Sequence, residues 1–205
     1  MLENIRQRFQ DSHLSDDPVT NVMNRLPQEI VDNYLKKTDL KHAGVLIGLE
    51  EDPKLGLTVL LTKRTTKLKQ HAGEISLPGG SFDQQRDQNI LSTALREARE
   101  EIGLDQDHTE ILGFLEPQVS LGTGFIVTPS IASIGSNFVP KIDANEVAEL
   151  FAVPLSFFLD HNNLNHEYRI FDQIKWSVYS YHYDQYMIWG LTAQIIRKFC
   201  KEIIQ

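Results

Sequence analysis

The chain has 205 residues, with 20 Lys and Arg against 28 Asp and Glu, and its formal net charge is −8. A hydrophobic content of 41% and a charged content of 23% are ordinary for a globular domain, which excludes a disordered, collagen-like or disulfide-scaffold chain. The acidic balance argues against polymeric nucleic acid as a partner. The single cysteine, Cys200, cannot form an internal disulfide, which suits a reducing compartment.

Targeting and membrane signals are missing from the sequence. Its longest apolar runs fall far short of the roughly 18 residues that span a bilayer, and its first residues lack the apolar core of a secretion signal. We therefore expect a cytoplasmic protein with no membrane partner, present as a monomer or homodimer. The length predicts one domain over residues 39–205, preceded by an N-terminal helical arm over residues 1–38.

The arm contains two short helical patterns. Leu2, Ile5 and Phe9 recur at helical spacing, and Asp16-Asp17-Pro18 then interrupts the pattern. A second amphipathic piece is predicted from about Gln28 to Leu35.

The domain begins with a predicted hairpin, in which Ala43–Leu49 and Leu57–Thr62 are strands and Glu50–Pro53 is the charged turn. A basic loop and a short strand, Ile75–Leu77, follow before Pro78-Gly79-Gly80. Other predicted elements are strands at Ile111–Leu115, Phe125–Ile134 and Val147–Val153, a short helix from Pro154 to Phe158, a late hairpin of Tyr168–Phe171 and Trp176–Tyr183, and a closing helix over Ile188–Ile203. This irregular alternation predicts an α/β fold with a mixed sheet and helices packed on it.

One helix, from about Asn89 to Ile102 with Gly103 as its C′ residue, is poorly explained by structure alone. Its apolar stripe leaves Glu97, Glu100 and Glu101 on roughly the opposite side. Glu97 and Glu101 are like charges at i,i+4, and acids in the last turn oppose the helix dipole by about 0.3–1 kcal/mol each. A pairing of Arg96 with Glu100 relieves this only in part, so we interpret the acidic face as functional.

Carboxylates on one helical face suit a hard divalent cation. Mg²⁺ takes oxygen ligands and shares phosphate oxygens with a substrate, and two such ions could clamp a phosphoryl displacement. Pro78-Gly79-Gly80 offers backbone that a phosphate or a metal can approach closely.

At this point the residues match a known pattern. Gly80 and the run from Arg96 to Leu104 resemble the Nudix box, whose second half is matched at every specified position. The first half departs from the pattern: the spacing from Gly80 to Arg96 is two residues longer, and the lone glutamate of the pattern is missing. Asp83 and Asp87 occupy this loop instead.

The longer loop with its aspartates is similar to the loop of a Nudix subgroup that acts on coenzyme A. That subgroup carries an upstream signature, which is seen here as Leu60-Leu61-Thr62-Lys63-Arg64, Lys69, Gly73 and Leu77-Pro78-Gly79-Gly80. Thr65 replaces Ser or Ala, and Lys69 replaces Arg, which removes a bidentate fork. The resemblance spans about residues 40–200.

The resemblance implies a Nudix-like α/β/α sandwich that hydrolyses a small nucleotide substrate with Mg²⁺ or Mn²⁺. In the subgroup, the pyrophosphate of coenzyme A is cut into 3′,5′-ADP and 4′-phosphopantetheine. The implied catalytic residues are Glu97, Glu100, Glu101 and Arg96, with Arg96 orienting the glutamates. The implied metal site is formed by Glu97, Glu100, Glu101 and Gly80, and the substrate-binding residues are Arg64, Lys69, Gly79 and Gly80. Glu101, Glu100 and Glu146 are each candidates for the general base.

Two alternatives remain open. A Nudix hydrolase could act on another nucleoside diphosphate derivative, such as ADP-ribose or a dinucleoside polyphosphate; the upstream signature favours coenzyme A. A non-catalytic Nudix-like nucleotide sensor is the alternative of another class, and it predicts decay of the carboxylates, all three of which are present.

Overall fold

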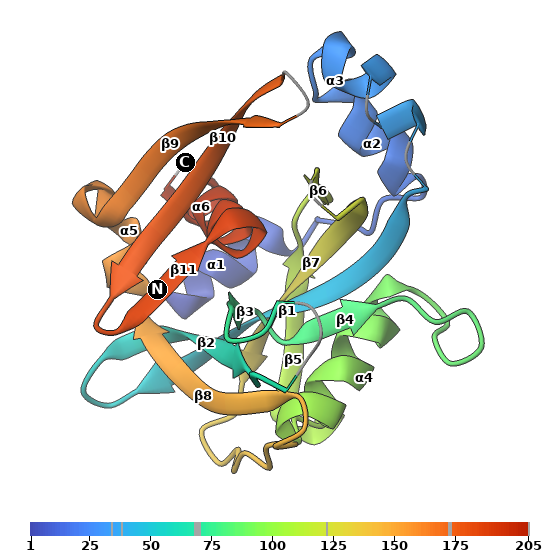
Figure 1. The fold of residues 1–205 in the computed structure, drawn as a ribbon. Coiled ribbons are helices and arrows are strands. Elements are labelled where there is room, and N and C mark those ends of the chain that lie inside the picture. Colours follow the sequence, from blue (N-terminus) through green and yellow to red (C-terminus); the bar gives the residue numbers. More distant parts are fainter. Residues whose placement is uncertain (34, 38, 68–70, 122, 172–173, 205) are drawn as a thin grey trace.

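The computed structural model of the chain describes residues 1–33, 35–37, 39–67, 71–121, 123–171 and 174–204. Its largest element is a mixed sheet of eight strands (Figure 1). These strands are β1 (Lys41–Asp52), β2 (Gly56–Arg64), β3 (Ile75–Ser76), β4 (Gly79–Ser81), β5 (Thr109–Phe114), β6 (Gln118–Ser120), β7 (Phe125–Ile134) and β8 (Val147–Pro154). The order is β3-β2-β1-β7-β5, and β4 pairs with β1, β6 with β7 and β8 with β2.

The centre of the sheet is the parallel pair β1 and β7, and the other pairings are antiparallel. Leu46 and Ile47, consecutive residues of β1 that point to opposite faces, are both completely buried. Helices must therefore cover both faces, and this explains why β1 is a continuous apolar run rather than an alternating one.

The first hairpin is confirmed, but its turn lies later than predicted. Strand β1 continues through the charged residues to Asp52, and the Asp52 side chain accepts hydrogen bonds from the backbone N–H groups of Lys54 and Leu55 at 2.7 and 2.8 Å. An aspartate that bonds the backbone two or three residues ahead stabilises a turn at that point. The acidic residues 50 and 51 therefore belong to the strand.

Helices cover both faces of the main sheet (Figure 1). Helix α4 (Ile90–Ile102) packs Ala98 and Ile102 against one face, in a cluster that includes Leu46. Helices α1 (Leu2–Phe9) and α6 (Gly190–Ile204) cover the other face, in a larger cluster that includes Ile47. The predicted α/β class with a mixed sheet between helices is confirmed, and the short helix after Pro154 is α5 (Leu155–Leu159).

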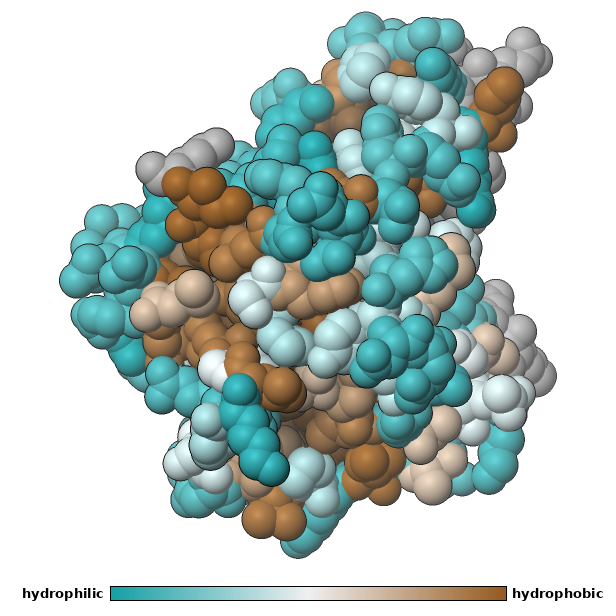
Figure 2. Space-filling view, turned by 90° about the vertical axis from the view of Figure 1, so that its left-hand side faces the viewer, coloured by the Kyte–Doolittle hydropathy of each residue, from teal (hydrophilic) through white to brown (hydrophobic). Residues whose placement is uncertain are grey.

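The late hairpin belongs to a second, antiparallel sheet with the order β11-β10-β9. Its strands are β9 (Leu164–Phe171), β10 (Ile174–Tyr183) and β11 (Tyr186–Trp189). The predicted start of the closing helix at residue 188 is wrong, because Ile188 and Trp189 pair with Tyr181 and Ser180 of β10. Figure 2 shows hydrophobic surface on the side of the molecule that carries β9; Tyr168, Ile170 and Met187 are exposed in this sheet.

The arm contains one more helix than predicted. The sequence predicts a break at Asp17 and Pro18, but Asp17 is the N-cap of α2 (Pro18–Asn24), with its side chain accepting from the Thr20 N–H at 3.0 Å. Proline is favoured at the first helical position, where its missing N–H costs nothing. Helix α3 (Gln28–Asn33) follows, and the remaining short 3-10 turns are η1 (Leu35–Lys37), η2 (Gln106–His108) and η3 (His161–Asn163). Within the described ranges, none of the helices is long and apolar enough to cross a membrane.

Candidate active site

Helix α4 is fixed at both ends by its own sequence. Asn89 and Ser92 form a capping box, in which the Asn89 side chain accepts from the Ser92 N–H and the Ser92 hydroxyl accepts from the Asn89 N–H, at 2.9 and 3.0 Å. Gly103 ends the helix in the left-handed conformation at φ 75°. The carboxylates therefore project from a helix with defined ends.

The three glutamates of α4 differ in exposure, although the helical pattern places them together on the side opposite the apolar stripe. Glu101 is only 1% exposed because it follows Ala94 and Ala98 at helical spacing and so lies on the buried side. Glu97 is partly buried, and Glu100 is exposed. Only Glu97 and Glu101 therefore face the interior of the site.

Glu101 is held by two groups from the main sheet. Its carboxylate accepts a hydrogen bond from the Gly79 N–H at 3.1 Å and lies 3.6 Å from the guanidinium of Arg64. Gly79 belongs to β4 and Arg64 ends β2, so the sheet brings two segments of the proposed substrate-binding signature to one carboxylate.

Arg96 is the centre of an ion-pair network. Its guanidinium donates to Asp87 at 2.7 and 2.9 Å, to Glu97 at 2.5 Å and to Glu100 at 3.1 Å. The predicted Arg96–Glu100 pair is therefore present, while Glu100 also pairs with Arg86. The sequence had placed Asp87 in the loop that lacks the glutamate of the pattern, but its pairing with Arg96 was missed.

Gly79 and Gly80 belong to strand β4. They pair with Val45 and Gly44 of β1. A Cβ on Gly79, whose φ is 148°, would collide with the backbone of β1, and a Cβ on Gly80 would collide with the Glu97 carboxylate. Glycine is therefore required at both positions for close packing within the protein, and the group that packs against Gly80 is the Glu97 carboxylate.

Glu146 is anchored beside Arg64 by the backbone. The carbonyl of Glu146 accepts from the Thr65 N–H at 2.9 Å, and Val147 pairs with Arg64. The Arg64 Nε is buried and, within the described chain, has no hydrogen-bond partner. Lys69, the other predicted basic contact, lies outside the described residues.

The carboxylates of the site repel one another. Burial raises the pKa of Glu101 to about 7, against the lowering effects of the Gly79 N–H and Arg64, and Glu97 and Glu146 raise it further by charge repulsion. Burial likewise raises the pKa of Glu97, with Glu100 and Glu146 adding to the effect while Arg96 opposes it. Buried, mutually repelling carboxylates gain from a cation placed between them.

The donor set fits a divalent metal, although the side chains are not arranged around one. Carboxylate oxygens are the ligands that Mg²⁺ prefers. In the parts of the chain that the structure describes, no three His, Cys, Asp or Glu side chains are grouped tightly enough to hold an ion as they stand. A bound ion would therefore have to draw Glu97, Glu101 and Glu146 together.

Comparisons with known proteins identify the family of the chain. The NUDIX domain model matches residues 40–173. An uncharacterized Nudix hydrolase NudL of Photorhabdus laumondii is 36% identical over 185 residues, which cover 86% of this chain and 89% of the relative. The protein of the same name from Citrobacter koseri is 37% identical over 165 residues, which cover 80% of this chain and 83% of the relative. A MutT/nudix family protein from Enterococcus faecalis has a similar fold, with a TM-score of 0.52 at 16% identity over 94% of this chain and 76% of that one.

The chain belongs to the Nudix hydrolase family. It is an enzyme that acts on the phosphoanhydride bond of a nucleoside diphosphate derivative, a small-molecule substrate. Nudix hydrolases generally use divalent metal ions, and the carboxylates of α4 are consistent with that requirement.

Proposed function

We propose that this enzyme hydrolyses the pyrophosphate bond of coenzyme A or its derivatives, giving 3′,5′-ADP and (acyl-)4′-phosphopantetheine. The observation that carries the proposal is Arg64. It ends the Leu60–Arg64 segment of the coenzyme A signature, lies 3.6 Å from Glu101, and keeps a buried Nε without a partner among the described residues. A charged donor beside the carboxylates is suited to a phosphate oxygen of an anionic substrate.

In this proposal Glu97, Glu101 and Glu146 hold Mg²⁺ or Mn²⁺. When bound, the ion neutralises charge on the pyrophosphate and activates water. Arg96, fixed by Asp87, positions Glu97, and Arg64 orients the pyrophosphate. Glu100 is exposed and pairs with Arg86 and Arg96. In this proposal it supports the network and contributes to the metal site from its rim.

Hydrolysis itself requires a base and a leaving group. Water attacks one phosphorus in line, a new P–O bond forms, and the bridging P–O bond breaks to release the second phosphate. Glu146 and Glu101 are our preferred acceptors for the proton of the water, because both lie beside Arg64, whereas Glu100 is exposed and doubly paired.

The test is a substrate panel. Purified full-length protein with Mg²⁺ or Mn²⁺ is given coenzyme A, an acyl-coenzyme A, ADP-ribose and a diadenosine polyphosphate, and the products are separated by chromatography. We expect 3′,5′-ADP from the coenzyme A compounds. Release of products from ADP-ribose or the dinucleotide alone would contradict the proposal and support the second Nudix substrate class.

Glu101→Gln provides the matched variant. Its amide oxygen can still accept from Gly79, so the fold is retained, while the charge that a cation needs is removed. We expect a loss of roughly 100-fold or more in kcat, the scale of losing a strong electrostatic contributor. Glu51→Gln, at an exposed position of β1, is the control that keeps normal turnover.

A further inference from the structure

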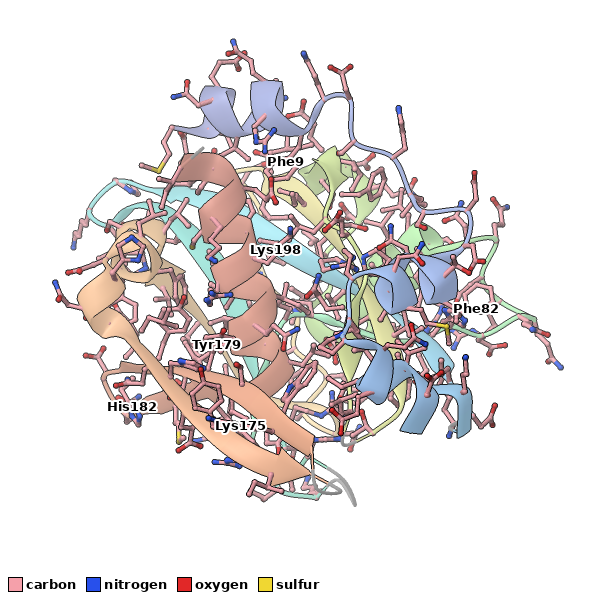
Figure 3. All side chains as sticks on the ribbon, turned by 90° about the horizontal axis from the view of Figure 1, so that it is seen from above. Phe9, Phe82, Lys175, Tyr179, His182 and Lys198 are labelled. Carbon is pink, nitrogen blue, oxygen red and sulfur yellow. The ribbon has the colours of Figure 1, made fainter. Side chains whose placement is uncertain are left out.

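A cavity away from the carboxylate site lies between the two sheets and the arm. It has a volume of about 330 Å³ and is bounded by β10, by α6, by Gln118 of β6 and by Pro27 and Ile30 at α3. Figure 3 shows Lys175 and Tyr179 on β10 and Lys198 on α6 around this region. None of these residues belongs to the Nudix pattern or to the carboxylate site.

The cavity carries excess positive charge. Lys198 is neutralised by Glu116 and Glu202, at 3.1 and 2.9 Å. Lys175 and Arg197 have no carboxylate at ion-pair distance among the residues that the structure describes; Arg197 lies 4.2 Å from the ring centre of Tyr179, and Lys175 lies 3.9 Å from that of Tyr168. Two unneutralised cations at one concave site attract an anion.

The rest of the lining provides aromatic and amide groups. Trp176 and Tyr179 form part of the wall, and the Tyr179 ring already stacks with His166 and packs against Arg197. Gln118 is 7% exposed, and its amide is fixed: the nitrogen donates to the carbonyls of Glu116 and Pro117, and the oxygen accepts from Gln194 at 3.1 Å. This leaves the Gln194 amide oxygen to accept from a ligand. Flat aromatic walls with a few fixed polar groups are typical of sites for nucleotide bases.

The register of the main sheet relates the cavity to the carboxylates. Gln118 pairs with Val127, Val127 with Ala43, and Ala43 with Ser81, which follows Gly80 in β4. Three strand spacings separate Gln118 from Ser81 by roughly 14–15 Å. The carbonyl of Ser81 accepts from Arg96, so the cavity, on the face covered by α6, and the carboxylate site, on the face covered by α4, lie at the same end of the sheet.

We propose that this cavity binds the phosphorylated adenosine end of the substrate, with Arg197 and Lys175 as its phosphate contacts and Trp176 as a wall for the base. The inference rests on the proposed function, because a coenzyme A substrate carries a second phosphate on its adenosine half, away from the pyrophosphate. Arg197 and Lys175 then determine substrate specificity without taking part in the chemistry.

The test measures binding and turnover separately. Binding of 3′,5′-ADP to the full-length protein is followed by calorimetry, with adenosine and 4′-phosphopantetheine as comparison ligands, and steady-state kinetics are measured with coenzyme A. Arg197→Gln and Lys175→Gln should each weaken 3′,5′-ADP binding about tenfold and raise KM for coenzyme A similarly, with kcat within twofold of wild type. Arg197→Lys should recover part of the binding.

Lys201→Gln, at an exposed position of the same helix, is the control and should bind as wild type does. Lys175 is also exposed, so its variant keeps the test valid if Arg197→Gln does not fold. Wild-type affinity in both variants, or failure of the wild type to bind 3′,5′-ADP, overturns the inference. If coenzyme A is hydrolysed but KM is unchanged in the variants, the inference about the cavity fails and the proposed function stands. If 3′,5′-ADP binding depends on Arg197 but coenzyme A is not hydrolysed, the cavity is supported and the proposed function is contradicted.

Discussion

Gly80 controls the position of one carboxylate in the site. It opposes Gly44 in the β1–β4 pair, and the space where a Cβ would stand is filled by the carboxylate of Glu97. Arg96 holds that carboxylate from the other side at 2.5 Å. Glu97 is therefore confined between a guanidinium and a strand residue that has no side chain.

Replacing this glycine should impair catalysis more than folding. In Gly80→Ala the new methyl group must displace the Glu97 side chain, so we expect kcat to fall at least tenfold, since small misplacements of catalytic groups cost about 100-fold. The free energy of unfolding should fall by about 1–3 kcal/mol, the usual cost of overpacking. Turnover in saturating metal and urea denaturation measure the two effects.

Gly48→Ala is the control for this substitution. Gly48 is a buried glycine of β1, and a Cβ there meets its nearest atom, on Ile134, at an ordinary contact distance of 3.4 Å. Equal turnover in the two variants would show that the position of Glu97 does not limit the reaction.

At the scale of elements, the loop between β4 and α4 is fastened to the helix by Asp87. Its carboxylate accepts from Arg96, from the Thr93 hydroxyl at 2.9 Å and from the Asp83 N–H at 2.9 Å, and its side chain is 1% exposed. Loop and helix therefore share one buried network, which also fixes the arginine that holds Glu97.

Asp87→Asn should loosen this loop and destabilise the protein. Removing one partner of a buried ion pair costs about 3–5 kcal/mol; because Arg96 keeps Glu97 and Glu100, we expect about 2–3 kcal/mol at pH 7 by chemical denaturation. Asp107→Asn, at an exposed position, should change stability by less than about 0.5 kcal/mol.

The pH dependence of this effect has a definite sign. Hydrogen bonds from Arg96 hold the pKa of Asp87 well below its usual value. The stabilisation is therefore complete above the unfolded-state pKa of about 4 and is lost as the pH falls below it. The stability difference between wild type and Asp87→Asn should shrink in acid; a difference that stays constant down to pH 2 would contradict a role for the Asp87 charge.

Local patterns predicted the elements well and the contacts between them poorly. Strand β7 has the predicted bounds, and Gly103 ends α4 as expected, because both depend on periodicity and on one residue's backbone preference. The burial of Glu101 was readable from its spacing to Ala98 but was obscured by grouping it with Glu100. The Asp87–Arg96 pair and the cavity at Arg197 join separate segments of the chain, and no local pattern encodes such contacts.

At the scale of the whole molecule, the first helix of the predicted arm shares a core with the last helix. Ile5 and Phe9 are 1% and 5% exposed and belong to the cluster that contains Phe199 and Cys200. The rings of Phe9 and Phe199 stack with centroids 5.9 Å apart. Because α1 and α6 are at opposite ends of the sequence, their packing joins the chain termini to the main sheet.

This shared core makes Cys200 a reporter of cooperative unfolding. The thiol is 5% exposed, and burial raises its pKa to about 12, so the native protein should resist thiol reagents at pH 8. Phe9→Ala removes a ring that packs on the neighbouring Phe199, and we expect it to lower the free energy of unfolding by about 3–5 kcal/mol and to accelerate labelling of Cys200. Leu55→Ala, at a residue that is 45% exposed, is the control and should alter neither quantity measurably.

In urea, labelling of Cys200 and far-ultraviolet circular dichroism should share one midpoint in wild type, because α1, α6 and the sheet bury the same cluster. Labelling at a clearly lower urea concentration than the loss of helix and sheet would show that the terminal helices detach first.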